Sequence, residues 1–402
     1  MRELLWTQRR IAWYLILSNF ALYFGFRVWQ ALFNNFAVEV IGVGPAEIGG
    51  IQAIREIPGL LGFTVGFLVL ALSETRLMAL SIALLGAGIA LTGWAGSVPT
   101  LLLGTLVMSV GFHFFIPASN AVLLMATEKR DTPRAMGQLR SLGALAALLA
   151  TGTVYLLAGR IGYRALFYGA GGAAMLAGLA LIPVRFGGDR LPLRRKVRFR
   201  RRYWLYYALS FLMGSRRHIF TTFAIFLLVR EHGIPVQTTA LLFLANGLVN
   251  AYAYQGIGRL VARFGERAVL SAGFSLLIFV FLGYAYVPYL PLLYALFVLD
   301  NVIFGTNLAV STYLQKIAVG DEELTSNLSL QQTLNHISAI AMPLIGGTVW
   351  TLFGARAPFL MGVAIAALSL ALAQFMRVPA PPGNGRPSKG AAAAPKHMRP
   401  IG

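Results

Sequence analysis

Charged and histidine side chains within long apolar stretches are the residues of this sequence best suited to do chemistry. An ionised side chain at the centre of a bilayer costs roughly 2.5–3.5 kcal/mol on insertion scales, so such residues are candidates for function. Guanidinium groups bind carboxylates and phosphates through paired hydrogen bonds, whereas carboxylates and imidazoles can exchange protons. The candidates are Arg27, Arg55, Glu56, His113, Arg140, Arg216, Arg217, His218, Asp300 and His336.

The balance of these charges predicts an anionic ligand. Five arginines accompany only two acids, so two or three cations remain after pairing, depending on whether Arg140 is counted. Excess buried positive charge is costly unless an anion compensates it. We predict that Arg27 and Arg217 bind the anion and that Arg55 and Arg216 assist. The other predicted substrate-binding residues are Tyr23, Gln30, Asn246 and Asn250.

Four titratable residues are predicted to couple or gate the movement of the ligand. Glu56 and Asp300 can take up a proton when a closing cavity removes water from them, and His336 and His113 titrate near neutral pH. Two other interpretations stay open. Some arginines can be locked in ion pairs, as Arg27 with Glu56, and a single helical histidine is more often a packing residue. The histidine spacing matches no metal-ligand motif, so neither a metal nor a catalytic residue is predicted.

The composition indicates that membrane-spanning helices position these residues. The chain has 402 residues, of which 57% are apolar and only 12% charged, and its mean hydropathy is +0.69. One span needs about 20 apolar residues of helix, which leaves room for about twelve spans. The apolar runs lack two-residue alternation and therefore predict helices. The predicted spans are 11–40, 46–71, 77–95, 98–126, 134–158, 163–184, 203–230, 236–260, 267–286, 289–316, 325–352 and 357–376.

Polar residues at helical spacing place the candidates on common faces. In the first span, five polar residues lie three or four positions apart and therefore share one stripe. Stripes that face one cavity would give a polar binding site at mid-membrane. The first stripe contains Asn19, Tyr23, Arg27, Gln30 and Asn34; others run through Ser210, Gly214, Arg217 and Thr221, through Ser109, His113, Pro117 and Asn120, and through Gln332 and His336.

The distribution of Lys and Arg predicts the orientation of the chain. Most of these residues in the connections lie on the side of the N-terminus, and the stretch 185–202 is the most basic. The positive-inside rule therefore places both termini in the cytoplasm, with the chain in the cytoplasmic (inner) membrane. This layout accounts for the formal net charge of +20 without a nucleic-acid partner. The opposite side carries only Arg160, Arg164, Arg230 and Arg356.

A sparse internal repeat predicts two related halves. Arg27 aligns with Arg217 at an offset of 190 residues, and 162–165 aligns with 354–357 at an offset of 192. We predict an all-α membrane protein with twelve transmembrane helices in two pseudo-symmetric six-helix bundles. The predicted domains are an N-terminal half (1–184), a basic cytoplasmic loop (185–202), a C-terminal half (203–377) and a disordered cytoplasmic tail (378–402).

The connection after the eighth predicted span carries a family motif. From Gly258 to Arg267 it resembles the loop signature of the major facilitator superfamily, Gly-x-Leu-x-Asp-Arg-x-Gly-x-Arg, although Ala262 replaces the aspartate. The drug-antiporter subfamily of that superfamily is disfavoured, because its fourth-span arginine and its fifth-span proline are absent here. The residues assigned to the loop motif are Gly258, Arg259, Arg263, Gly265 and Arg267.

The resemblance implies alternating access around a central cavity between the two halves. An arginine in the first span with a symmetry-related arginine in the seventh is similar to the organophosphate–phosphate exchangers of this superfamily. By that similarity, Arg27 and Arg217 would hold a phosphate or carboxylate between the halves, with Arg216 as the alternative partner.

The predicted function is that of a monomeric secondary transporter for a small carboxylate- or phosphate-bearing anion, acting as an exchanger or coupled to protons. No enzyme activity and no cofactor are expected, because the sequence has no nucleotide-binding motif and no cysteine. Two alternatives remain: efflux of amphipathic drug-like or lipid-like compounds, and a non-transporting receptor or assembly protein with a transporter fold. The expected partners are the substrate, the lipid bilayer and, in the proton-coupled case, protons.

Overall fold

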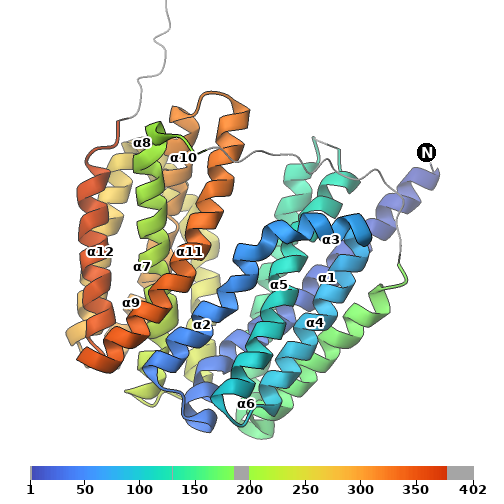
Figure 1. The fold of residues 1–402 in the computed structure, drawn as a ribbon, viewed down its shortest axis with the longest axis horizontal. Coiled ribbons are helices and arrows are strands. Elements are labelled where there is room, and N and C mark those ends of the chain that lie inside the picture. Colours follow the sequence, from blue (N-terminus) through green and yellow to red (C-terminus); the bar gives the residue numbers. More distant parts are fainter. Residues whose placement is uncertain (1, 129, 185–198, 378–402) are drawn as a thin grey trace, which may run out of the picture.

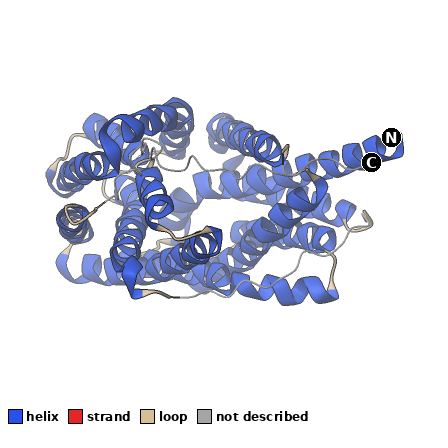
Figure 2. Cartoon of the chain, turned by 90° about the horizontal axis from the view of Figure 1, so that it is seen from above, coloured by secondary structure: helices blue, strands red, loops and turns tan. Residues whose placement is uncertain are grey.

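The protein is an assembly of packed helices (Figures 1 and 2). The computed structural model describes residues 2–128, 130–184 and 199–377, and no strand occurs in these ranges. The predicted tail (378–402) and most of the predicted basic loop, residues 185–198, lie outside the described residues.

The first six crossings of the chain form the N-terminal bundle. Long apolar sequences build its helices, and polar residues begin them: the Ser73 side chain caps α4 by accepting a hydrogen bond from the Arg76 backbone N–H at 3.3 Å. The elements are α1 (Arg2–Asn35) continued by η1 (Phe36–Ile41), α2 (Pro45–Leu60) continued by η2 (Leu61–Thr64) and α3 (Val65–Ala71), α4 (Glu74–Trp94), α5 (Val98–Ala126) and α6 (Thr132–Leu181).

The last six crossings form the C-terminal bundle. Proline occupies the first turn of α9 and of α12, where the N–H that it lacks has no partner within the helix. The elements are η3 (Arg201–Tyr203), α7 (Trp204–Arg230), α8 (Val236–Tyr286), α9 (Leu290–Phe304), α10 (Asn307–Ile317), α11 (Asp321–Phe353) and α12 (Ala357–Ala373).

Two glycines divide the longest helices into two crossings each. Gly162 within α6 has φ 77° and ψ 170°, and Gly265 within α8 has φ 80° and ψ 166°. Only glycine adopts this region without a large steric cost. Helices α6 and α8 span 50 and 51 residues, and each supplies two crossings on either side of its glycine.

The predicted fold of twelve transmembrane helices in two pseudo-symmetric bundles is confirmed. Eight helices of the described residues are long and apolar enough to cross a membrane, and α12 is a shorter apolar helix. The remaining crossings arise because α6 and α8 each supply two, and because α2, η2 and α3 together build one more.

The repeated segments predicted from the sequence share one backbone geometry. Gly354, which ends α11, has φ 85° and ψ 174°, close to the angles of Gly162 at the aligned position. In each bundle, the arginine two residues after this glycine contacts the end of a neighbouring helix. Arg164 donates hydrogen bonds to carbonyls at the end of α4, and the Arg356 guanidinium lies 5.3 Å from the ring centroid of Tyr286 at the end of α8. The domain boundaries themselves stay a prediction.

The two bundles are in close contact at the end of the molecule opposite the start of α1. There α2 crosses α11 so closely that a Cβ atom on Gly49 would lie 2.2 Å from the Pro343 carbonyl oxygen. A Cβ atom on Gly347 would lie 2.5 Å from the Pro45 carbonyl oxygen. From this crossing the two helices diverge toward the end at which α1 begins (Figure 1). We call this closed end the seal.

Polar contacts between the bundles complete the seal. The Asn35 side chain donates to the Ile234 carbonyl oxygen at 2.9 Å and accepts from the Thr239 hydroxyl at 2.9 Å. The Arg230 guanidinium donates to the Val43 carbonyl oxygen at 2.9 Å. These bonds join α1 and the segment that follows it to α7 and α8, so the seal does not depend on one helix pair alone.

Adjacent glycines of α2 provide a test of the seal. Gly49→Ala places a methyl group against the backbone of α11, and overpacking of this kind typically costs about 1–3 kcal/mol. Gly50→Ala is the matched control, because its Cβ atom would meet nothing within 4 Å and alanine raises helix propensity. We expect the thermal unfolding midpoint in detergent to fall for Gly49→Ala and to hold or rise for Gly50→Ala. Equal midpoints for the two variants would contradict the close crossing.

Candidate functional site

A cavity of about 970 Å³ lies between the two bundles. The N-terminal bundle contributes α1, α2 and α6 to its wall, and the C-terminal bundle contributes α7, α8 and α9. Most of the substrate-binding residues predicted from the sequence lie in this wall, which agrees with the polar stripes proposed for the first and seventh spans. Those that line the cavity are Tyr23, Arg27, Gln30, Arg55, Arg217, Asn246 and Asn250.

Arg27 extends into the cavity from the middle of α1. Its Nη1 atom donates to the Gln30 side-chain oxygen at 2.7 Å, which is one helical turn away. Its Nε atom is buried and has no hydrogen-bond partner. Among the described residues no carboxylate forms an ion pair with Arg27, because Glu56 pairs with Arg55 at 2.7 Å instead. The Arg27 guanidinium therefore retains donor capacity for a ligand.

Arg216 and Arg217 share one carboxylate but occupy different environments. Asp300 of α9 is fully buried and lies 2.8 Å from Arg216 Nη1 and 3.4 Å from Arg217 Nη1. Consecutive residues of a helix point about 100° apart, so Arg216 is directed into the bundle, with no exposed surface, while Arg217 reaches the cavity. Arg216, predicted as a substrate residue, therefore does not line the cavity.

Further contacts hold Arg217 in place. Its Nη1 atom also donates to the Asn301 side-chain oxygen at 3.3 Å. The ring of Phe304 lies 4.1 Å from the guanidinium carbon, a cation–π distance. Asn301 and Phe304 lie on α9 in the same cavity wall. The guanidinium is thus oriented before any ligand arrives.

The charge of the cavity wall is entirely positive. Arg27, Arg55, Arg140 and Arg217 line it, and the lining residues include no aspartate or glutamate. Of these four, Arg55 is paired with Glu56, and Arg217 shares Asp300 with the buried Arg216. Arg27 and Arg140 have no ion pair within the described part of the chain. The positive charge of the wall is therefore only partly compensated by carboxylates of the described residues.

Aromatic residues make up much of the remaining wall, and sequence analysis did not single most of them out. On a membrane helix an aromatic side chain gives no signal that separates a cavity wall from a lipid-facing surface. The residue type alone is uninformative, but the spacing from a polar stripe could have identified some of them. Phe33, for example, comes three residues after Gln30 and so lies near the same helix face. The aromatic lining residues are Tyr23, Trp29, Phe33, Phe220, Phe243, Tyr252, Tyr254, Phe297 and Phe304.

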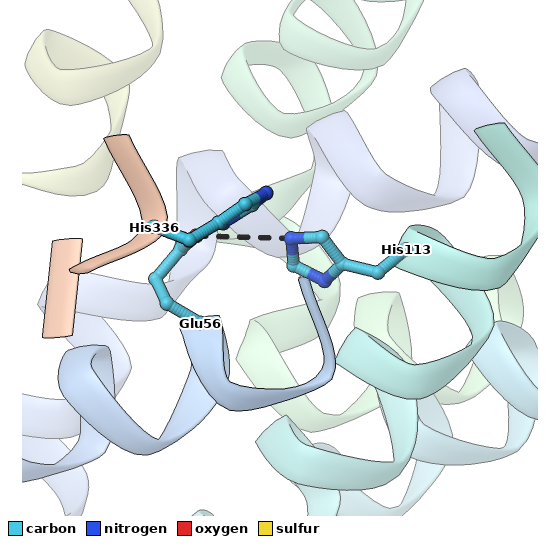
Figure 3. A group of neighbouring side chains, drawn as sticks. All are labelled: Glu56, His113 and His336. Atoms are coloured by element: carbon cyan, nitrogen blue, oxygen red, sulfur yellow. Dashed lines mark hydrogen bonds and ion pairs between the residues drawn. The ribbon is translucent and has the colours of Figure 1, made fainter. Parts of the chain in front are cut away.

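The predicted coupling residues separate into two places. Asp300 belongs to the arginine pair just described, whereas Glu56, His113 and His336 converge from α2, α5 and α11 (Figure 3). Glu56 Oε2 lies 3.3 Å from His336 Nδ1 and 3.7 Å from His113 Nε2. These three groups are the described residues whose ligand atoms are close enough to share a metal ion. Sequence spacing did not suggest a metal site, since the three residues are far apart in the chain.

The loop motif surrounds the glycine that divides α8. Gly258, Arg259, Arg263 and Arg267 flank Gly265, whose positive φ requires glycine there. Arg267 donates to the Gln374 side-chain oxygen at 3.1 Å, just after α12. Glu266 forms a 2.6 Å ion pair with Lys316 at the end of α10. The motif thus ties the α8 turn to two other helices of the same bundle.

Substitution of the shared carboxylate tests this electrostatic arrangement. Asp300→Asn leaves the fully buried Arg216 without a counterion, and removing one partner of a buried pair typically costs about 3–5 kcal/mol. We expect a clear drop in the thermal unfolding midpoint, partly restored in the double variant Arg216→Met/Asp300→Asn. An Asp300→Asn protein as stable as the parent would contradict the assignment of this pair.

Comparisons with known proteins agree with the arrangement of the bundles. No curated protein matches the sequence. Among solved structures, a mutant of the nucleoside transporter NupG has a TM-score of 0.76 at 13% identity, and the match covers 91% of this chain and 99% of that protein. A bacterial homolog to the human lysosomal transporter Spinster, in an inward-facing and occupied conformation, also has a TM-score of 0.76, at 14% identity, with coverage of 91% and 96%.

The family comparison covers nearly the whole chain. The model of the Major Facilitator Superfamily matches residues 15–318 and 205–401. The loop motif at the α8 turn and the cavity between two six-helix bundles are the features expected from the predicted resemblance. The chain belongs to the Major Facilitator Superfamily.

Proposed function

We propose that this transporter carries a small organic anion whose carboxylate or phosphate group binds Arg27 and Arg217. The observation that carries the proposal is the cavity wall, which has four arginines and no acidic residue. Each of the two guanidinium groups comes from a different bundle, so one anion between them would contact both halves. Charge-assisted hydrogen bonds of this kind contribute about 1.5–3 kcal/mol each.

The rest of the wall supports an organic rather than an inorganic anion. Aromatic rings from both bundles, among them Phe33 and Phe243, line a cavity of about 970 Å³. That volume is typical of sites for drug-sized molecules and far exceeds the space that a single phosphate needs. Tyr23, Gln30, Asn246 and Asn250 supply polar groups that would orient the uncharged part of the ligand.

The closed seal supports a conformation that is open toward the termini. The bundles touch at the end opposite the start of α1, and the positive-inside rule predicts that the termini lie in the cytoplasm. In this proposal the cavity faces inward and both termini lie on the cytoplasmic side of the inner membrane. Exchange or proton coupling, and function as a monomer, stay predictions.

The aromatic wall also favours a second candidate, the efflux of amphipathic compounds. Such a ligand would be bound mainly by the rings, with the arginines serving other roles. The two candidates differ in their dependence on Arg27, because an amphipathic compound without an anionic group gains little from its guanidinium. A non-transporting receptor would bind a ligand without moving it.

Substitution of the cavity arginines tests the proposed anion site. We expect anions such as an organophosphate or an aromatic carboxylate to raise the thermal unfolding midpoint of the purified protein. Arg27→Gln and Arg217→Gln should each weaken anion affinity about 10- to 100-fold, because each removes charge-assisted hydrogen bonds. Arg160→Gln is the matched control, since Arg160 is exposed and outside the cavity wall.

The ligand screen distinguishes the candidates. Amines, nucleosides and uncharged amphipathic compounds are included beside the anions. Stabilisation by amines or amphipathic compounds but not by anions would contradict the anion proposal. Undiminished anion binding in both cavity variants would contradict the residue assignment. Flux of the stabilising anion in proteoliposomes then separates a transporter from a receptor, which would bind without flux.

A further inference from the structure

Glu56, His113 and His336 form a cluster at the boundary between the bundles, outside the cavity wall. Glu56 Oε2 lies 3.3 Å from His336 Nδ1 and 3.7 Å from His113 Nε2, and the three ligand atoms all lie within 4.8 Å of one another. Neighbouring ligands of a tetrahedral zinc ion are about 3.3–3.5 Å apart, given metal–ligand bonds of about 2.0–2.2 Å. Two of these separations are close to that geometry, and small rotations of the imidazole rings would shorten the third.

The hydrogen bonding of His113 leaves one of its nitrogens free to bind a metal. Its Nδ1 atom lies 3.0 Å from the Ser109 backbone carbonyl oxygen, which can only accept a hydrogen bond. A neutral His113 that donates from Nδ1 to this carbonyl has its lone pair on Nε2, which faces the Glu56 carboxylate at 3.7 Å. Two such facing acceptors can share a cation, which is either a proton or a metal ion. A backbone carbonyl that fixes the tautomer in this way is a typical outer partner of a metal-binding histidine.

Gly59 provides the space in which the two imidazoles meet. A Cβ atom at this position would lie 2.4 Å from His336 Cε1 and 2.7 Å from His113 Cδ2. The ring centroids of the two histidines are 5.5 Å apart and the ring planes are inclined by 70°. In Figure 3 the His113 ring is directed toward Glu56 and His336, whose side chains overlap in this view. Each of the three side chains is 10–19% exposed, so none of them is completely enclosed.

We propose that Glu56, His113 and His336 bind a divalent metal ion such as Zn²⁺. Two neutral imidazoles and one carboxylate oxygen are a donor set that suits Zn²⁺, Co²⁺ or Ni²⁺, with a water molecule in the fourth position. Arg55 holds Glu56 Oε1 at 2.7 Å and leaves only Oε2 for the metal. Mg²⁺ and Ca²⁺ require more oxygen ligands than this cluster offers.

The bound ion would join the two bundles. Glu56 on α2 and His113 on α5 belong to the N-terminal bundle, whereas His336 on α11 belongs to the C-terminal bundle. Glu56 lies seven residues from Gly49 and His336 seven residues from Pro343, so the site is two helical turns, about 10 Å, from the closest crossing of the seal. Any conformation that separates α11 from α2 breaks the ligand set. The metal therefore stabilises the sealed conformation and slows transport.

Cobalt spectroscopy tests the site on the full-length protein. The protein is purified in detergent with an affinity tag that contains no histidine, because a polyhistidine tag would itself bind metal. A chelator then removes bound metal. We expect Co²⁺ to give the visible absorption of a four-coordinate ion and Zn²⁺ to displace it and raise the thermal unfolding midpoint. Mg²⁺ should do neither. His113→Ala and His336→Ala should abolish the Co²⁺ absorption.

Matched variants separate ligand loss from general damage. His218→Ala removes another membrane-embedded histidine, which contacts Asn335 at 3.4 Å rather than the cluster, and should keep the Co²⁺ absorption. Gly59→Ala keeps every ligand but displaces the imidazoles, and should weaken Co²⁺ binding at least tenfold. Arg27→Gln should leave metal binding intact, which makes this test independent of the anion proposal. Absence of the Co²⁺ band in the parent protein, or its persistence in the double variant His113→Ala/His336→Ala, would overturn the site.

Discussion

One buried carboxylate shared by two guanidinium groups sets the electrostatics of the central cavity. Asp300 compensates the fully buried Arg216 and also orients Arg217 toward the cavity. A single negative charge cannot neutralise both arginines, so positive charge remains at the cavity surface. Arg27 on the opposite wall adds a cation with no acidic partner among the described residues. Asp300 thus supplies a counterion for Arg216 inside the C-terminal bundle, while the cavity wall keeps positive charge that no lining acid compensates.

Under the anion proposal, this charge also links ligand occupancy to the approach of the bundles. Arg27 and Arg217 belong to different halves, and two like charges oppose the closure of the space between them. An anion between them would replace that repulsion by two attractions. A ligand shifts a conformational equilibrium only by its difference in affinity for the two states. Here that difference would come from one charged group contacting both bundles at once.

The sequence was sufficient for the fold and for much of the cavity wall, because both depend on local patterns. Apolar runs and glycine turns define the helices, and the stripe containing Arg27 and Gln30 marks a polar face. Sequence could not separate Arg216 from Arg217, since their environments depend on where α9 places Asp300. It also missed the convergence of Glu56, His113 and His336, which lie on three helices brought together only by tertiary packing.

The close crossing of α2 and α11 has a consequence for leakage across the membrane. Gly49 and Gly347 bring backbone atoms, not flexible side chains, into contact. A gap of about 0.5–1 Å already removes a quarter to a half of the dispersion attraction between such atoms, and at these two glycines no side chain can follow the retreating backbone. At this crossing the helices therefore pass from contact to separation over a short displacement. Such switching shortens the time during which both ends of the cavity could admit water or ions.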